Sequence, residues 1–196
     1  MSGNAVVQAA RKEGRTLLTE VEAKQVLKEA GIQVTDTRLA KDKAEARQIA
    51  KELGYPVVLK IVSPDIIHKS DIGGVKLGLA DDAAVGAAHD EIISAAKRAA
   101  PSANLHGVSV QAMAEPGTEI ILGMSKDPQF GPVLMFGLGG VLVEVLKDVA
   151  FRIVPLTDRD VKQMVREIKG FPVLEGYRGQ DPANIAEIEQ AILKLS

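Results

Sequence analysis

The sequence predicts a mixed α/β (α+β) fold built as two lobes, and three observations indicate it. Capped helices alternate with apolar strands over residues 16–112. Residues 118–153 are instead rich in short strands separated by turns, a pattern typical of an antiparallel sheet. The 196 residues, of which 46% are hydrophobic, are enough for two small lobes with a real core. We therefore expect a linker or short helix at residues 1–15, one lobe at residues 16–112 and a second at residues 113–196.

The first lobe begins with a clear helix start. Thr19 and Glu22 have the spacing of a capping box, in which each side chain bonds the backbone N–H of the other residue. Apolar residues then recur on one helical face, and Gly31 is placed to end the helix. Residues 32–34 are expected to form a short strand.

A second capped helix leads into the most informative strand of the chain. Asp42 and Glu45 repeat the capping pattern, and Gly54 is expected to end this helix. The continuous apolar run Val57–Val62 then predicts a strand buried on both faces.

The rest of the first lobe alternates in the same way. Val75–Leu79 is expected to be a strand, and Asp81-Asp82 caps a helix that Pro101 ends. Residues 107–113 alternate apolar and polar side chains and predict a strand that leads into a hinge at residues 111–117.

The second lobe is expected to be a sheet followed by helices. Thr157 with Asp160 caps one helix, and Asp181-Pro182 opens the last. A glycine cluster stands at residues 137–140. The predicted strands are 118–125 (TEIILGMS), 132–137 (PVLMFG), 141–146 (VLVEVL) and 149–154 (VAFRIV).

Lys60 interrupts the apolar strand 57–62 and needs a reason to be there. A buried ammonium is costly unless it is paired. Its partner is therefore either a carboxylate of this chain or an anion that comes from outside.

The loop after this strand favours an anion. Ile66-Ile67 is expected to anchor the loop, the polar run from His68 to Asp71 to be exposed, and Gly73-Gly74 to let backbone N–H groups approach a phosphate beside Lys60 and Lys69. A Gly pair between strands is also a common tight turn, so a structural reading stays open. If the loop reshapes around phosphate, Gly74→Val should leave the melting temperature almost unchanged.

Two carboxylates of the second lobe are ambiguous. Glu119 starts an apolar strand beside the hinge, where it suits a ribose or an ammonium group, or is simply a strand-end side chain in water. Glu144 lies within the predicted strand 141–146, and pairing with Arg152 or Lys147 is its ordinary explanation.

Composition excludes several classes of function. A net charge of −2 and 3% aromatic residues argue against a nucleic-acid surface. No run reaches the length of a membrane span, and the first residues lack the apolar core of a signal peptide, so we expect a cytoplasmic protein. The absence of Cys excludes disulfides and a Cys nucleophile. His89 and His106 have no neighbours at metal-ligand spacing, and no metal ligands are assigned.

Four stretches together carry a family resemblance, whereas the Walker A pattern GxxxxGK[ST] is absent. They resemble the ATP-grasp domain of the ADP-forming acyl-CoA synthetases, meaning the beta subunit of ADP-forming acetyl-CoA synthetase or the equivalent region of the fused enzymes. The similarity covers residues 16–177. The stretches are LLTEVEAKQVLKEAGI, YPVVLKIVSPDIIHKSDIGGV, VSVQAMAEPGTEIILGMSKDPQFGPVLMFGLGG and VEVLKDVAFRIVPL.

The resemblance implies a role for each matched residue. Lys60 matches the strand lysine that contacts the phosphates of ATP or ADP. Gly73 and Gly74 match the flexible glycine loop. His68 matches a histidine on a mobile loop that takes a phosphoryl group from the partner subunit and delivers it to ADP.

The remaining matched residues concern the nucleoside. The resemblance places Gln111 at the hinge near the adenine, where the backbone of Met113 would also serve, and Glu119 on the ribose side.

The resemblance also implies what lies outside this chain. In the family, strands beyond the last helix carry the Asn and Asp ligands of Mg²⁺, so we expect an ATP-grasp fold without its C-terminal strands and Mg²⁺ ligands elsewhere. A CoA-binding alpha subunit, or fused domains, is the expected partner. The expected function is part of an acid–CoA ligase that couples acyl-CoA, ADP and phosphate to acid, CoA and ATP. The alternative is a nucleotide-sensing or scaffold domain like those joined to acetyltransferases.

Overall fold

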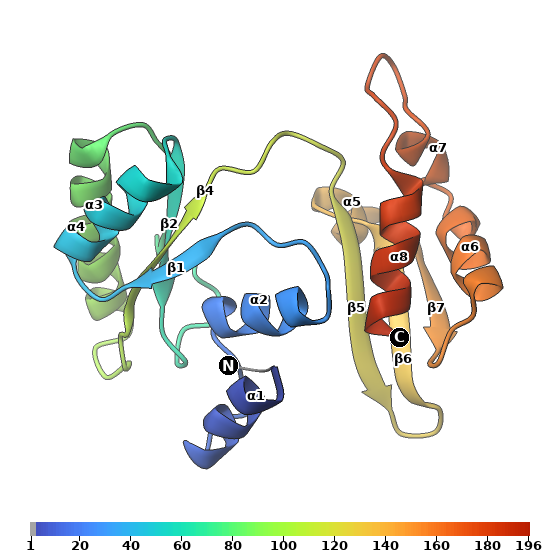
Figure 1. Cartoon of the computed structure of the whole chain (residues 1–196), viewed down its shortest axis with the longest axis horizontal. Helices are drawn as coiled ribbons and strands as arrows, with labels where there is room; N and C mark the ends of the chain where they lie inside the picture. Colours follow the sequence, from blue (N-terminus) through green and yellow to red (C-terminus); the bar gives the residue numbers. More distant parts are fainter. Residues whose placement is uncertain (1–2) are drawn as a thin grey trace. The chain divides into compact units, whose positions relative to one another are not determined.

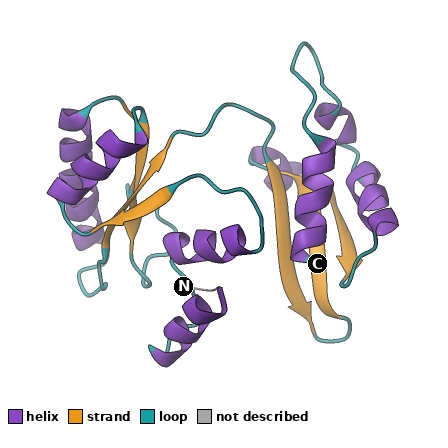
Figure 2. Ribbon diagram, viewed as in Figure 1, coloured by secondary structure: helices purple, strands orange, loops and turns teal. Residues whose placement is uncertain are grey.

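The computed structural model describes residues 3–196, except for the side chains of residues 3, 4, 141, 142 and 144. The chain folds as two compact units, Met1–Ala114 and Glu115–Ser196. Each unit has its own sheet (Figures 1 and 2). Each also has its own hydrophobic core. Among the described helices, none is long and apolar enough to cross a bilayer.

The first unit is built on a four-stranded sheet in the order β1-β4-β2-β3, and every neighbouring pair is antiparallel. Its central strand β2 keeps the expected bounds, and five of its six residues are buried. The strands are β1 (Thr37–Ala40), β2 (Val57–Val62), β3 (Val75–Leu79) and β4 (Gly107–Ala112).

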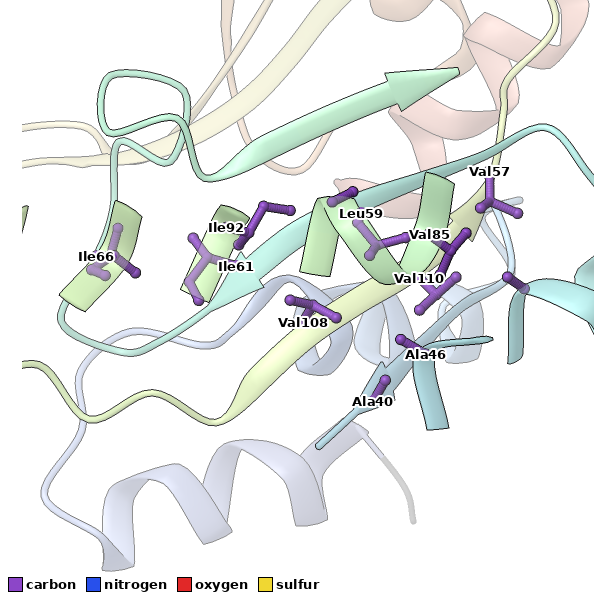
Figure 3. Close-up of a cluster of buried hydrophobic side chains, with 13 residues drawn as sticks. Ala40, Ala46, Val57, Leu59, Ile61, Ile66, Val85, Ile92, Val108 and Val110 are labelled. Atoms are coloured by element: carbon purple, nitrogen blue, oxygen red, sulfur yellow. The ribbon is translucent and has the colours of Figure 1, made fainter. Parts of the chain in front are cut away.

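Helices α3 (Lys43–Leu53) and α4 (Asp82–Ala99) cover one face of this sheet. Asp42 and Asp81 cap them as predicted, each accepting a backbone N–H with its side chain. The core of the unit lies between these helices and the sheet (Figure 3). Its largest members include Leu59, Ile61, Ile92, Val85, Val108 and Val110.

The opposite face of the sheet carries polar side chains. Side chains alternate along a strand, so Lys60 faces away from the core that holds Leu59 and Ile61. Its antiparallel neighbour Ser109 shares that face. Helix α2 (Glu20–Glu29) contributes side chains to it.

Helix α2 begins with the predicted capping box between Thr19 and Glu22. Helix α1 (Gly3–Lys12) packs on α2 and buries Val6 and Ala10.

The second unit is a three-stranded antiparallel sheet with helices on one face. Its core lies between the sheet and the two helices α6 and α8, and includes Phe136, Leu134, Met164 and Ile192. The elements are β5 (Ile120–Asp127), β6 (Gly131–Leu138), α5 (Val141–Leu146), β7 (Val149–Ile153), α6 (Asp158–Glu167), α7 (Phe171–Leu174) and α8 (Ile185–Leu195).

Two predicted elements were wrong, and a third, correctly predicted as a helix, begins at another residue. Residues 32–34 form no strand, and pairing with β4 begins only at Thr37. The run 141–146 is a helix and not a strand. Strand β7 pairs directly with β6, so this apolar segment is the connection between the two strands. The last helix is capped by Asn184 instead of being opened by Asp181-Pro182.

The predicted pairing of Glu144 lies outside the described residues, because its side chain is not described. Arg152 forms its ion pair with Glu167 of α6.

Candidate functional site

Lys60 is paired with a carboxylate of this chain. Its Nζ donates to Oε1 of Glu20 over 2.7 Å. Glu20 is the first residue of α2, where the positive end of the helix dipole favours a carboxylate. Of the two partners that the sequence left open for Lys60, the structure therefore contains the internal one.

Two further lysines surround the same carboxylate. Lys24 Nζ lies 3.3 Å from Glu20 Oε1, and Lys69 Nζ lies 3.3 Å from Oε2. All four side chains are mostly buried, with about a fifth of each exposed. We call Lys24, Lys60 and Lys69 the lysine cluster. Three ammonium groups and one carboxylate leave a net charge of +2 on this face of the sheet.

The carboxylate is held ionised by its neighbours. Burial acts to raise the pKa of Glu20, but the hydrogen bond from Lys60 and the charges of the lysine cluster outweigh it and lower the pKa to about 2. Burial also lowers the pKa of Lys24, against the attraction of Glu20.

The three lysines differ in how many N–H groups remain available. Lys24 donates to three neutral oxygens, namely those of Thr35, Thr37 and Gln111 at 2.7, 2.8 and 2.8 Å. An ammonium has three N–H groups, so Lys24 is saturated. Among the described residues, Lys60 and Lys69 each donate a side-chain hydrogen bond only to Glu20. These two retain donors for an incoming anion.

Lys60 and Lys69 open on a surface pocket of about 460 Å³. The structure thus brings Lys60 together with His68, two residues that the sequence singled out separately. His68 is exposed, and its side chain makes no hydrogen bond to a described residue. The pocket is lined by Glu20, Lys60, Ile67, His68, Lys69, Ser70, Asp71 and Val75.

The predicted apolar anchor of the loop is half right. Ile66 is buried in the core of the first unit, but the side chain of Ile67 is 67% exposed.

The two glycines have different roles. Gly73 has φ +70°, a conformation that L side chains rarely adopt. Gly74 is required by a close approach, since a Cβ there would lie 2.7 Å from Ile61 Cγ2 and 2.8 Å from the carbonyl oxygen of Lys69. Their N–H groups donate to Ser70 and Lys69 carbonyls. In this conformation the glycine amides therefore close a tight turn and are not directed at an anion.

The expected adenine-side residues lie at the end of β4. Gln111 is buried, and its Oε1 accepts hydrogen bonds from Lys24 and Thr37. Met113 has an exposed side chain, and its backbone N–H donates to Pro56. The backbone N–H of Met113 is therefore already used in this contact with Pro56.

Glu119 belongs to the second unit, directly before β5. Its carbonyl accepts from Gly139 N at 2.7 Å. Its carboxylate lies against Gly140, where a Cβ would be 2.6 Å from Oε2. The glycine cluster at residues 137–140 thus makes room for this carboxylate.

Sequence reasoning missed Glu20 and Lys24. The available signal was an acid–lysine pair at i,i+4 in the first turns of a capped helix, which normally indicates only a solvent-exposed pair. Among the described side chains, no three from His, Asp or Glu come together as metal ligands. His89 contacts Asp90 at 3.3 Å.

A family model described as an ATP-grasp domain matches residues 9–196. Because this match spans most of the chain, the chain belongs to the ATP-grasp family.

Within that family, this chain is similar to the ATP-grasp part of the ADP-forming acetate–CoA ligases. It is 47% identical over 190 residues to the ADP-forming acetate–CoA ligase I subunit beta of Pyrococcus furiosus, covering 97% of this chain and 82% of the relative. It is 51% identical over 171 residues to acetate–CoA ligase I of Archaeoglobus fulgidus, covering 87% of this chain and 25% of that longer protein.

Solved structures agree with this assignment. The dinucleotide forming acetyl-coenzyme A synthetase 1 of Ca. Korarchaeum cryptofilum, in complex with coenzyme A, Ca-AMPCP and HgCl⁺, has a TM-score of 0.96 at 47% identity and covers 98% of this chain and 84% of that one. A second structure of this synthetase holds Mg-AMPPCP with a phosphohistidine segment pointing towards the nucleotide binding site. Its TM-score is 0.86 at 43% identity, over 98% of this chain and 83% of that one.

Proposed function

We propose that this chain is the nucleotide-binding part of an ADP-forming acyl-CoA synthetase, which couples acyl-CoA, ADP and phosphate to free acid, CoA and ATP. One observation carries the proposal. Lys60 and Lys69, the two lysines with N–H groups to spare, open with His68 on one pocket, where their ammonium groups can donate to an anion. Such a pocket suits a phosphoryl group.

His68 is the proposed phosphoryl carrier. A neutral imidazole nitrogen attacks the phosphorus of an acyl phosphate made by the partner, and the P–O bond breaks as the carboxylic acid leaves. A terminal phosphate oxygen of ADP then attacks the same phosphorus, and the N–P bond breaks to return the imidazole. Its exposure and lack of hydrogen bonds within the described residues support this role, because a carrier must be free to move.

The other proposed contacts hold the nucleotide. Lys60 and Lys69 neutralise phosphate charge, and the Gly73-Gly74 turn positions the loop. Gln111 and the Met113 backbone lie on the adenine side and Glu119 on the ribose side, following the resemblance.

No three carboxylate or histidine side chains gather among the described residues. Following the resemblance, we propose that the Mg²⁺ ligands lie outside this chain, and no step here is assigned to the metal.

A CoA-binding alpha subunit or fused domains is the proposed partner, because the relatives are beta subunits or longer single chains. The acyl group is open, since one relative of 46% identity is a 4-hydroxybutyrate–CoA ligase. A cytoplasmic location stays a prediction. The alternative of a nucleotide-sensing domain is not favoured, because these relatives are ligases.

The test is to titrate the chain with ATP, ADP and adenosine by calorimetry, then to assay ATP formation after adding a CoA-binding partner subunit. The proposal expects phosphate-dependent binding and partner-dependent ATP formation. Equal affinity for all three ligands would contradict it.

A further inference from the structure

Among the described residues, one ion pair holds the second half of the His68 loop. Its first half is fixed, because Ile66 enters the core and the Asp65 carboxylate accepts the backbone N–H of Asn104 at 2.7 Å. In the second half, residues 67–71, only Lys69 is not exposed. Its side chain ends on Glu20.

Glu20 connects this loop lysine to the strand lysine. One carboxylate oxygen accepts from Lys60 at 2.7 Å, and the other accepts from Lys69 at 3.3 Å. The two ammonium groups are therefore kept on either side of one carboxylate. Without that negative charge, the lysine cluster would repel the loop that carries Lys69.

From this geometry we propose that Glu20 is a positioning residue, which docks the His68 loop at the phosphate pocket by holding Lys69 beside Lys60. This inference rests on the proposed role of His68 as phosphoryl carrier. Glu20 itself needs to touch neither substrate nor phosphoryl group.

An ion pair suits a loop that must both dock at the pocket and move away from it. A partly exposed pair stabilises a docked state only weakly, whereas a buried apolar anchor would fix it. Phosphorylation of His68 would also place negative charge beside Lys69. That charge would compete with Glu20 for the Lys69 ammonium.

Three backbone amides report on the opening of the turn that carries Lys69. The N–H groups of Lys69, Gly73 and Gly74 donate within the loop to Ile67, Ser70 and Lys69 carbonyls. Hydrogen exchange at these amides measures how often the turn opens. We expect Glu20→Gln to raise their exchange by roughly fivefold, and Lys69→Gln to raise it similarly.

A double-mutant cycle separates the pair from general loosening. If the two side chains act through one contact, the double variant should exchange no faster than either single variant. Glu22→Gln is the matched control, because Glu22 lies on the same helix and pairs with Arg15 instead. Glu22→Gln should raise amide exchange in α2 and leave exchange at the three loop amides unchanged. Unchanged loop amides in Glu20→Gln, or multiplied effects in the double variant, overturn the proposal.

Turnover gives the second readout, with the complete enzyme reconstituted with its CoA-binding partner. Docking predicts that Glu20→Gln lowers kcat for ATP formation while the KM for ADP changes little, because Lys60 keeps its remaining donors. Full turnover by Glu20→Gln overturns the positioning role.

His68→Ala in the same assay reports on the proposed function itself. Loss of turnover in His68→Ala with full turnover in Glu20→Gln retains the function and rejects the positioning role. Full turnover in His68→Ala rejects the role of His68 as phosphoryl carrier. The proposed positioning role of Glu20 is then rejected as well.

Discussion

Gly74 lies directly against Ile61, so closely that a Cβ on Gly74 would meet Ile61 Cγ2 at 2.7 Å. Ile61 is fully buried in the core of the first unit. The turn after the His68 loop is therefore packed on the core at its far end, even though the loop itself is exposed.

The first prediction follows from this contact. Gly74→Val should lower the melting temperature by roughly 5–15 °C, because the added side chain displaces Ile61 from the core. This reverses the expectation from sequence, which treated Gly74 as part of a mobile loop. Gly73→Ala is the control, because a Cβ at Gly73 would meet only Ala95 at 3.9 Å. Its cost is the strain of a positive φ alone, so it should lower the melting temperature less. Thermal unfolding without nucleotide measures both, and equal losses would contradict the packing argument.

The second prediction concerns phosphate affinity. Lys60→Ala should weaken ATP and ADP by roughly 10- to 100-fold and adenosine little, because the lost hydrogen bonds go to phosphate. Lys51→Ala is a matched control, since Lys51 pairs with Asp82 on the opposite side of the sheet among α3 and α4. Calorimetry with the three ligands decides the question. Equal weakening of all three would mean that Lys60 is structural, serving only Glu20.

Local signals in the sequence predicted helix starts in both units. The capping boxes at Thr19 and Thr157 were found because each depends on residues three positions apart. The helix at 141–146 was missed, since a six-residue apolar run fits a strand as well as a helix. Glu20 was missed for another reason. Its partner Lys60 is 40 residues away, and no local pattern shows that the first residue of α2 reaches a side chain of β2.

The third prediction is a pH dependence of stability. The hydrogen bonds from Arg15 lower the pKa of Glu22 to about 2, against the effect of burial. A carboxyl group with a lowered folded-state pKa stabilises the protein above its unfolded pKa of about 4.3, and this stability is lost as the pH falls towards 2. The melting temperature should therefore drop between about pH 5 and pH 2.

Glu22→Gln tests this assignment. It should melt lower than the unmodified chain at about pH 7 and approach it only as the pH falls below about 2, where Glu22 is protonated in both states. A difference in melting temperature that stays constant over this range would exclude the ion pair with Arg15 as its cause.

The last prediction is that His68 becomes phosphorylated during turnover. The His68 side chain is exposed on the pocket that Lys60 and Lys69 line, and it forms no hydrogen bond to a described residue. A neutral imidazole nitrogen is a nucleophile that needs little activation. The complete enzyme with its partner is incubated with acetyl-CoA and labelled phosphate, then quenched in base, where phosphohistidine survives and acyl phosphate does not. Label should appear on His68 and disappear when ADP is added.

His106→Ala is the control for a second histidine of the same unit and should keep the label. Full ATP synthesis by His68→Ala would contradict the carrier role, because no other residue on this pocket is a histidine.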